Sequence, residues 1–177
     1  MELKDFAQRA IKKVYPRYGL RESDVILASY PKSGNTWVRF IWANMVSLME
    51  FDGREVDFHR IDSEFAAEYD SHTYECIHYN SLPRLVKTHR RYDKRFEKNR
   101  SIYIYRFPGD TMLSYYEYKI AQKGGIDAEV SFSEFIRDKN YGIPAWCRHV
   151  AGWLGSATKA ITYESMKTDD VQTMNNA

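Results

Sequence analysis

The eight residues Tyr30-Pro31-Lys32-Ser33-Gly34-Asn35-Thr36-Trp37 constrain the fold more than any other part of the chain. They follow the apolar run Val25-Ile26-Leu27-Ala28 and precede a stretch in which apolar residues recur at helical spacing. A strand, a tight loop and a helix start direct free backbone N–H groups and the positive end of a helix dipole toward one point. The pattern therefore predicts an anion site, to which Lys32 adds a positive charge.

The rest of the chain alternates between strand and helix patterns, which indicates a parallel α/β sheet within one domain over residues 1–177. Pro108 occupies a favoured first-turn position, and Ser131-Phe132-Ser133-Glu134 has the spacing of a capping box. We expect strands over residues 24–30, 82–88, 101–106 and 158–163. We expect helices over residues 2–14, 35–49, 109–122 and 144–154, and a short helix starting at the capping box.

Two segments require separate predictions. The helix over residues 35–49 is expected to bury an apolar stripe made of Val38, Ile41, Trp42, Met45 and Met49. Residues 52–80 show a mixed pattern, in which Phe65, Ala66 and Tyr69 suggest one short helix. The same segment contains three histidines without a recognisable ligand spacing, so we interpret them as surface or pocket-rim residues: His59, His72 and His78.

Composition excludes several functional classes. A net charge of +2 does not indicate a nucleic-acid-binding protein. Cys76 and Cys147 lack metal or redox spacing; they could form a disulfide, but nothing else suggests secretion. The charged start of the chain lacks the apolar core of a signal peptide, and no stretch approaches the roughly 20 apolar residues of a membrane span. We expect a soluble, reduced, cytoplasmic protein without a membrane partner.

Two further groups of residues carry candidate chemistry. Lys87-Thr88-His89 stands at the end of a predicted strand, where ligands bind in open α/β sheets, and a histidine there can act as a general base. Arg106 ends the next strand, and Ser114 lies two helical turns later. An arginine fork and a hydroxyl on a helix make a plausible phosphate clamp, although a surface ion pair is the simpler alternative.

The order of residues in the loop distinguishes it from nucleotide-triphosphate loops, in which the lysine follows the last glycine. Here Lys32 precedes Gly34, and Trp37 follows two polar residues. The loop resembles the 5′-phosphosulfate loop of the cytosolic-type sulfotransferases, whose donor is 3′-phosphoadenosine 5′-phosphosulfate (PAPS). The Lys-Thr-His and Arg…Ser segments are similar to the base and the 3′-phosphate site of the same family, in the same order.

The resemblance implies a P-loop-containing three-layer sandwich and transfer of a sulfuryl group to a hydroxyl or amine of a small-molecule acceptor, without a metal. It implies His89 as the base, Lys32 as the residue that neutralises charge on the leaving phosphate, and Lys87 as the residue that stabilises the sulfuryl group in transfer. The donor would be held by the loop, the Arg…Ser pair and two aromatic neighbours of the adenine: Lys32, Ser33, Gly34, Asn35, Thr36, Trp37, Arg106, Ser114 and Tyr163.

Two weaker resemblances extend the match toward Lys167. Residues 142–153 are similar to the family's Gly-x-x-x-His-Val-x-x-Trp helix, which is mainly structural. Tyr163-Glu164-Ser165-Met166-Lys167 resembles a Tyr-Glu-Asp-Met-Lys segment, with Ser165 in place of the usual aspartate. The family continues into an Arg-Lys-Gly…Gly-Asp-Trp-Lys loop that covers the donor and into a dimer motif. Neither is found here, so we expect a C-terminally short member.

Several alternatives stay open at this point. A short relative that binds nucleotide weakly or without catalysis is the main one, and a P-loop kinase is disfavoured by the position of Lys32. Arg90 and Arg91 either form a solvated loop or line the mouth of the acceptor site and favour an anionic acceptor. The pattern identifies neither the acceptor nor the oligomeric state.

Overall fold

The computed structural model describes residues 20–69, 79–122, 124–127, 129–169 and 172. The helix predicted over residues 2–14 lies outside these residues, as do His72, Cys76 and His78. The described residues group into two compact units: a first unit within residues 1–27, 36–88 and 93–101, and a second within residues 28–35, 89–92 and 102–177. The assignment of the whole chain to one domain stays a prediction.

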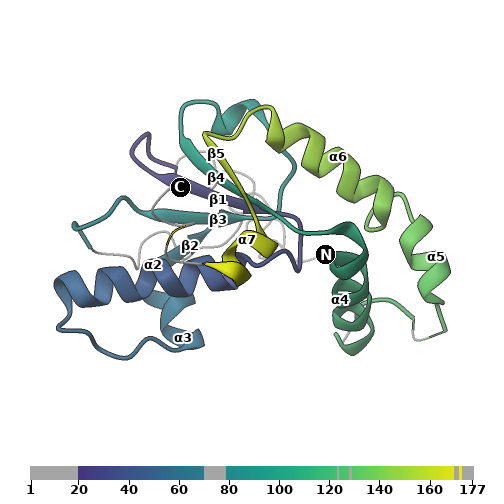
Figure 1. The fold of residues 1–177 in the computed structure, drawn as a ribbon, viewed down its shortest axis with the longest axis horizontal. Helices are drawn as coiled ribbons and strands as arrows, with labels where there is room; N and C mark the ends of the chain where they lie inside the picture. The colour runs from purple at the N-terminus through teal and green to yellow at the C-terminus, as the bar shows by residue number, and fades with distance from the viewer. Residues whose placement is uncertain (1–19, 70–78, 123, 128, 170–171, 173–177) are drawn as a thin grey trace, which may run out of the picture. The chain divides into compact units, whose positions relative to one another are not determined.

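Five parallel strands form one sheet flanked by helices, which confirms the predicted α/β fold (Figure 1). The strand order is β2 (Ala66–Glu68), β3 (Leu85–Thr88), β1 (Val25–Ser29), β4 (Arg100–Tyr105) and β5 (Lys159–Thr162). Ala66 is in register with Leu85, and Ile102 with Lys159. All residues of β1 are buried, as expected for a central strand covered on both faces. Within the described residues, no helix is both long and apolar enough to cross a membrane.

The first unit contains most of α2 (Asn35–Glu50), whose bounds agree with the prediction to within one residue. The predicted stripe is wrong in part, because Met45 and Met49 are 41% and 51% exposed. The fully buried apolar residues of the helix are smaller than methionine: Val38, Ala43 and Val46. These allow close packing, whereas the long methionine side chains lie toward solvent.

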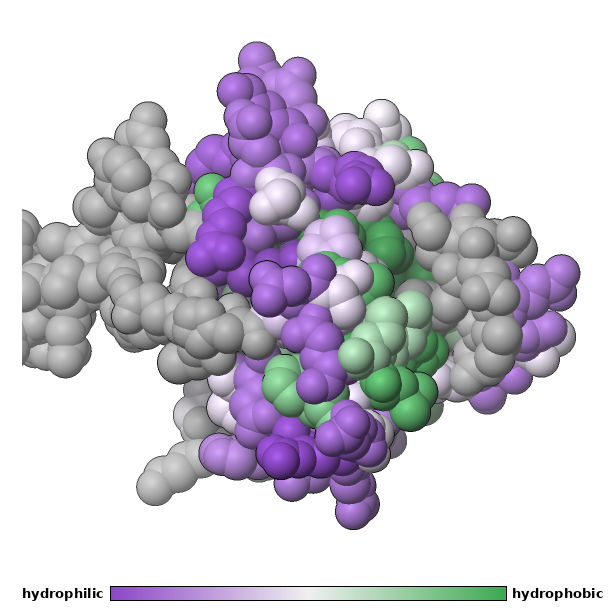
Figure 2. Space-filling view, turned by 90° about the vertical axis from the view of Figure 1, so that its left-hand side faces the viewer, coloured by the Kyte–Doolittle hydropathy of each residue, from purple (hydrophilic) through white to green (hydrophobic). Residues whose placement is uncertain are grey.

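Figure 2 shows one face of the molecule, on which a hydrophobic area is bordered by hydrophilic residues.

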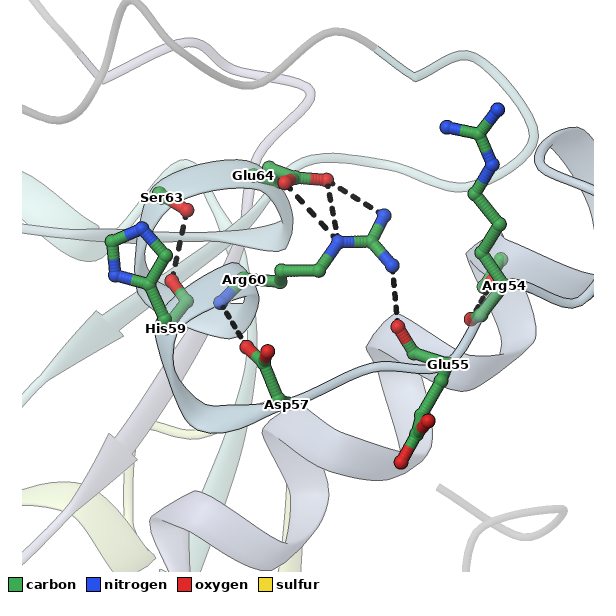
Figure 3. A network of polar contacts seen from close by, with 8 residues as sticks. Arg54, Glu55, Asp57, His59, Arg60, Ser63 and Glu64 are labelled. Atoms are coloured by element: carbon green, nitrogen blue, oxygen red, sulfur yellow. Dashed lines mark hydrogen bonds and ion pairs between the residues drawn. The ribbon is translucent and has the colours of Figure 1, made fainter.

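The segment with the mixed sequence pattern contains three short elements instead of one helix. The short α3 (Phe58–Arg60) continues as a π-helical turn (Ile61–Phe65), and the chain then enters β2. Arg60 fixes this turn by pairing with the carboxylate of Glu64 at 2.8 Å and donating to the backbone carbonyl of Glu55 (Figure 3). The helical prediction for Ala66 and Tyr69 is wrong, because Ala66 pairs with β3 and Tyr69 N–H donates to the carbonyl of Lys87.

The second unit contains α4 (Pro108–Ala121), α5 (Phe132–Arg137), α6 (Ile143–Leu154) and α7 (Tyr163–Thr168). The predicted positions of α4, α5 and α6 are confirmed, including Pro108 in the first turn and the capping box between Ser131 and Glu134. Met112 and Phe135 form a buried cluster with Tyr30. Cys147 is an exposed free thiol on α6.

A buried ion pair anchors the start of the sheet in the first unit. The guanidinium of Arg84 donates to both carboxylate oxygens of Asp24, at 2.9 and 2.6 Å. The two side chains are 7% and 0% exposed, and Asp24 also accepts a bond from the backbone N–H of Arg21. Removal of one partner would leave an uncompensated charge in a buried site.

We therefore expect Asp24→Ala to lower the free energy of unfolding by about 3–5 kcal/mol. Glu22→Ala is the matched control, since Glu22 lies two residues away and pairs with Lys98, and both of these side chains are more than three quarters exposed. That control should leave the free energy of unfolding nearly unchanged. Urea denaturation of both variants measures the difference, and equal losses would contradict the structural role of the buried pair.

Candidate active site

The loop between β1 and α2 has the backbone geometry of an anion cradle. Lys32 and Gly34 both have positive φ angles, of 66° and 102°. Left-handed residues in such a turn direct neighbouring N–H groups to one side. The left-handed conformation of Lys32 costs about 1–2 kcal/mol, and strain of this kind concentrates at functional sites. The first turn of α2 contains no acidic residue, so its positive dipole end is not neutralised.

Tyr163 closes the loop from the start of α7. A Cβ atom on Gly34 would lie 2.6 Å from Cδ2 of Tyr163 and 3.4 Å from Cε of Met166. No real Cβ atom approaches another carbon that closely, so only glycine fits between the loop and this ring. The conformation and the packing of the loop therefore both require glycine at this position.

Polar groups inside the loop are only partly satisfied. Ser33 is fully buried, and its Oγ has no hydrogen-bond partner among the described residues. A buried hydroxyl without a partner costs about 1–3 kcal/mol, which a ligand or a water molecule can recover. Asn35 donates to Oγ of Ser29 at 3.2 Å, which ties the loop to the end of β1. The loop thus offers the Ser33 hydroxyl in addition to its backbone N–H groups.

Arg106 follows β4 and lies beside the loop with weak protein contacts. Its guanidinium donates to the carbonyl of Lys32 at 3.4 Å and lies 3.6 Å from the carboxylate of Asp110. It also lies 4.5 Å from the centroid of the Tyr163 ring. Its Nε is buried without a partner in the part of the chain that the structure describes. These long contacts leave the planar donor fork available for an anion.

Ser114 lies on α4, half-buried, and no hydrogen bond joins it to Arg106 among the described residues. Tyr118 is one helical turn further along the same face of α4. The Lys32 ammonium lies 5.0 Å from the centroid of the Tyr118 ring. The face of α4 that contains Ser114 therefore also meets the lysine of the loop.

His89 follows the last residue of β3 and contacts the end of β1. Its Nδ1 lies 2.9 Å from the backbone carbonyl oxygen of Ser29 and 3.4 Å from the Ser29 hydroxyl. Because a carbonyl oxygen only accepts hydrogen bonds, this contact requires the proton on Nδ1 and leaves the lone pair on Nε2. That tautomer is the one in which Nε2 can accept a proton.

Three of the remaining predicted residues, Lys87, Thr36 and Trp37, lie in the first unit. Lys87 pairs with Glu68 of the neighbouring strand, with Nζ 3.1 Å from Oε1, and its side chain is 15% exposed. Thr36 accepts a long hydrogen bond of 3.5 Å from Arg39, and Trp37 is half-buried in the first turn of α2. Arg90 and Arg91, which belong to the second unit, are exposed, and their role at an acceptor site stays a prediction.

Two contacts of the site were not expected from the sequence. The Glu164 carboxylate accepts from the backbone N–H of Phe107 at 2.9 Å and fixes the turn that follows Arg106. The second is the contact between Tyr118 and Lys32. The sequence contains one indication of this contact, because Tyr118 follows Ser114 by one helical turn and so lies on the same face of α4. Across the described ranges, no group of three or more His, Cys, Asp or Glu residues is arranged to bind a metal ion.

Residues 22–177 match the sulfotransferase domain family. The chain belongs to that family. A rabbit (Oryctolagus cuniculus) amine sulfotransferase is 28% identical over 86% of this chain and 54% of its own length. A flavonol 3-sulfotransferase of Flaveria bidentis is 30% identical over 84% of this chain and 53% of its own.

The fold is also similar to that of a solved sulfotransferase. The crystal structure of mouse sulfotransferase SULT7A1 complexed with PAP superimposes with a TM-score of 0.65 at 24% identity. The match covers 94% of the present chain and 60% of the mouse protein. The chain thus spans about half the length of the two curated relatives above.

Substitution of Gly34 tests the close approach in the loop. Gly34→Ala should lower the free energy of unfolding by more than the roughly 1–2 kcal/mol that a left-handed alanine costs, because its Cβ also collides with Tyr163. Gly124→Ala is the matched control, since Gly124 has a φ of 74° and a Cβ atom added to it would meet no other atom within 4 Å.

Urea denaturation of the two variants gives the comparison. Addition of Tyr163→Ala to Gly34→Ala should recover the steric part of the loss, because the colliding ring is then absent. If Gly34→Ala loses no more stability than Gly124→Ala, the loop is not closed against Tyr163.

Proposed function

We propose that this protein transfers a sulfuryl group from PAPS to a hydroxyl or amine of a small-molecule acceptor. The observation that carries the proposal is the cluster formed by the left-handed loop, the unpartnered hydroxyl of Ser33 and the weakly bonded guanidinium of Arg106. This cluster supplies separate donors for the two phosphate groups of such a donor molecule. The match to the sulfotransferase domain, and a relative of the same fold in complex with PAP, support it.

Donor binding would be divided between the loop and the residues that surround it. The backbone N–H groups of residues 33–37, at the start of α2, hold the 5′-phosphate. Arg106 and Ser114 hold the 3′-phosphate. The Nε of Arg106, which has no partner among the described residues, is one of the donors available to it. Trp37 and Tyr163 are the aromatic neighbours of the adenine. None of these contacts requires a metal ion.

The residues of the chain also supply what the transfer step requires. When bound, PAPS supplies the sulfuryl group. His89 accepts the acceptor proton at Nε2 while the acceptor oxygen bonds to sulfur and the bond from sulfur to the leaving phosphate oxygen breaks. Lys32 neutralises the charge that develops on this phosphate, and Lys87 stabilises the group in transfer. Preorganised positive charge is the main catalytic contribution, as in phosphoryl transfer.

A second candidate function is nucleotide binding without transfer. The two functions differ in one measurable respect: both require binding of PAP, the desulfated product, but only the first requires His89. A P-loop kinase would in addition require ATP and magnesium, and the order of Lys32 and Gly34 argues against it.

Calorimetric titration with PAP in the absence of magnesium tests donor binding. Lys32→Ala and Arg106→Ala should each weaken the affinity by about 10- to 150-fold, because a hydrogen bond to a charged group contributes about 1.5–3 kcal/mol. Lys98→Ala is the control, since Lys98 is an exposed lysine that pairs with Glu22 in the first unit. A folded wild-type protein without measurable PAP affinity would contradict the donor site.

The rate of sulfuryl transfer from PAPS to a panel of phenols and primary amines tests the base. His89→Gln should lower the rate by about 100-fold or more, since general-base catalysis contributes about 10²–10⁴. The same variant should bind PAP as the wild type does, because His89 contacts the end of β1 and not the anion cradle. Retained transfer activity would exclude His89 as the base. Binding of PAP without transfer by the wild-type protein would favour the second candidate function.

A further inference from the structure

Two buried side chains of α6 lie near the segment that follows β3. Trp153 is fully buried, and its indole N–H donates to the backbone carbonyl of Arg90 at 2.9 Å. The ring of Tyr92 meets the Trp153 indole edge-on, with centroids 5.3 Å apart. The segment His89–Tyr92 is thus held by its backbone and by an aromatic contact, and all of these residues belong to the second unit.

His149 lies one helical turn before Trp153 and is only 2% exposed. Its Nδ1 is 3.0 Å from the hydroxyl of Tyr103, and its Nε2 is buried without a hydrogen-bond partner among the described residues. Burial lowers the pKa of His149 to about 4, and the nearby backbone of His89 and Arg90 partly opposes that effect. The imidazole is therefore neutral near pH 7 and does not repel a proton taken up by His89.

The same histidine also contacts the candidate donor loop. Its ring is perpendicular to that of Tyr30, the first loop residue, with centroids 5.5 Å apart. Tyr30 in turn donates from its hydroxyl to the carbonyl of Tyr141 at 2.7 Å. One helix therefore contacts both the start of the loop and the segment of the base.

We propose that Trp153 and His149 are positioning residues that hold His89 in the geometry required for proton transfer. This inference rests on the proposed function of His89. His89 lies beyond the last paired residue of β3 and is exposed, so the sheet does not fix it. The Ser29 carbonyl orients its ring, and α6 orients its backbone. Both anchors are needed, because a displacement of about 1 Å can lower a rate about 100-fold.

Trp153→Phe tests the proposal with the smallest change, since it removes the indole N–H and retains an aromatic ring beside Tyr103. Trp146→Phe is the matched control on the same helix, because the Trp146 Nε1 is buried but has no partner in the described residues. We expect Trp153→Phe to lower kcat for transfer from PAPS by about 10- to 100-fold, with affinity for PAP unchanged. The control should leave both quantities at their wild-type values.

The imidazole nitrogens of His89 provide a readout that does not depend on activity. A ¹⁵N spectrum of the neutral imidazole should show the proton on Nδ1 in the wild type and in Trp146→Phe. It should show a mixture of the two tautomers in Trp153→Phe, because a displaced ring loses its bond to the Ser29 carbonyl. His89→Gln assigns the resonance. If kcat and the tautomer of Trp153→Phe both match those of the control, the proposal is overturned.

The experiment separates this inference from the proposed function. A wild-type protein that neither binds PAP nor transfers sulfate would contradict the function, while the tautomer comparison would still test the positioning. If Trp153→Phe does not fold, the double variant Tyr103→Phe/His149→Phe replaces it. That variant removes both partners of one buried hydrogen bond, so neither is left unsatisfied. A wild-type tautomer in the double variant would exclude His149 as a positioning residue.

Discussion

The candidate site depends on the absence of a side chain at Gly34. The ring of Tyr163 occupies the space that a Cβ atom would need, and the Arg106 guanidinium lies against the same ring. One aromatic ring thereby joins the loop after β1, the turn after β4 and the start of α7 after β5. In parallel sheets the carboxyl ends of the strands form the binding edge, and this contact holds three of them together.

Tyrosine faces support both cations of the site. Lys32 lies over Tyr118 and Arg106 over Tyr163, at 5.0 and 4.5 Å from the ring centroids. A tyrosine face attracts a cation without neutralising it, and the Asp110 carboxylate near Arg106 is at the long distance of 3.6 Å. The positive charge is therefore held in place but stays available to an anionic ligand. Two of the 14 tyrosines of the chain thus lie beside the cations of the candidate site.

The sequence predicted those features that depend on local patterns. The apolar run of β1, the proline at the start of α4 and the capping box at Ser131 each encode a structure within a few residues. Features that depend on distant neighbours were missed or wrong. The three residues of β2 are a strand because β3 lies beside them, and Met45 is exposed although its spacing is that of a buried face. The contact of Tyr118 with Lys32 likewise arises only when α4 meets the loop.

The burial of His149 links the integrity of the second unit to acidity. The unfolded chain takes up a proton at this imidazole below about pH 6.5, whereas the folded chain resists it until about pH 4. Folding therefore becomes less favourable as the pH falls through this interval, by up to about 3 kcal/mol from this residue alone. Acidification therefore acts first on the packing of α6, because His149 lies between the Tyr103 hydroxyl and the ring of Tyr30.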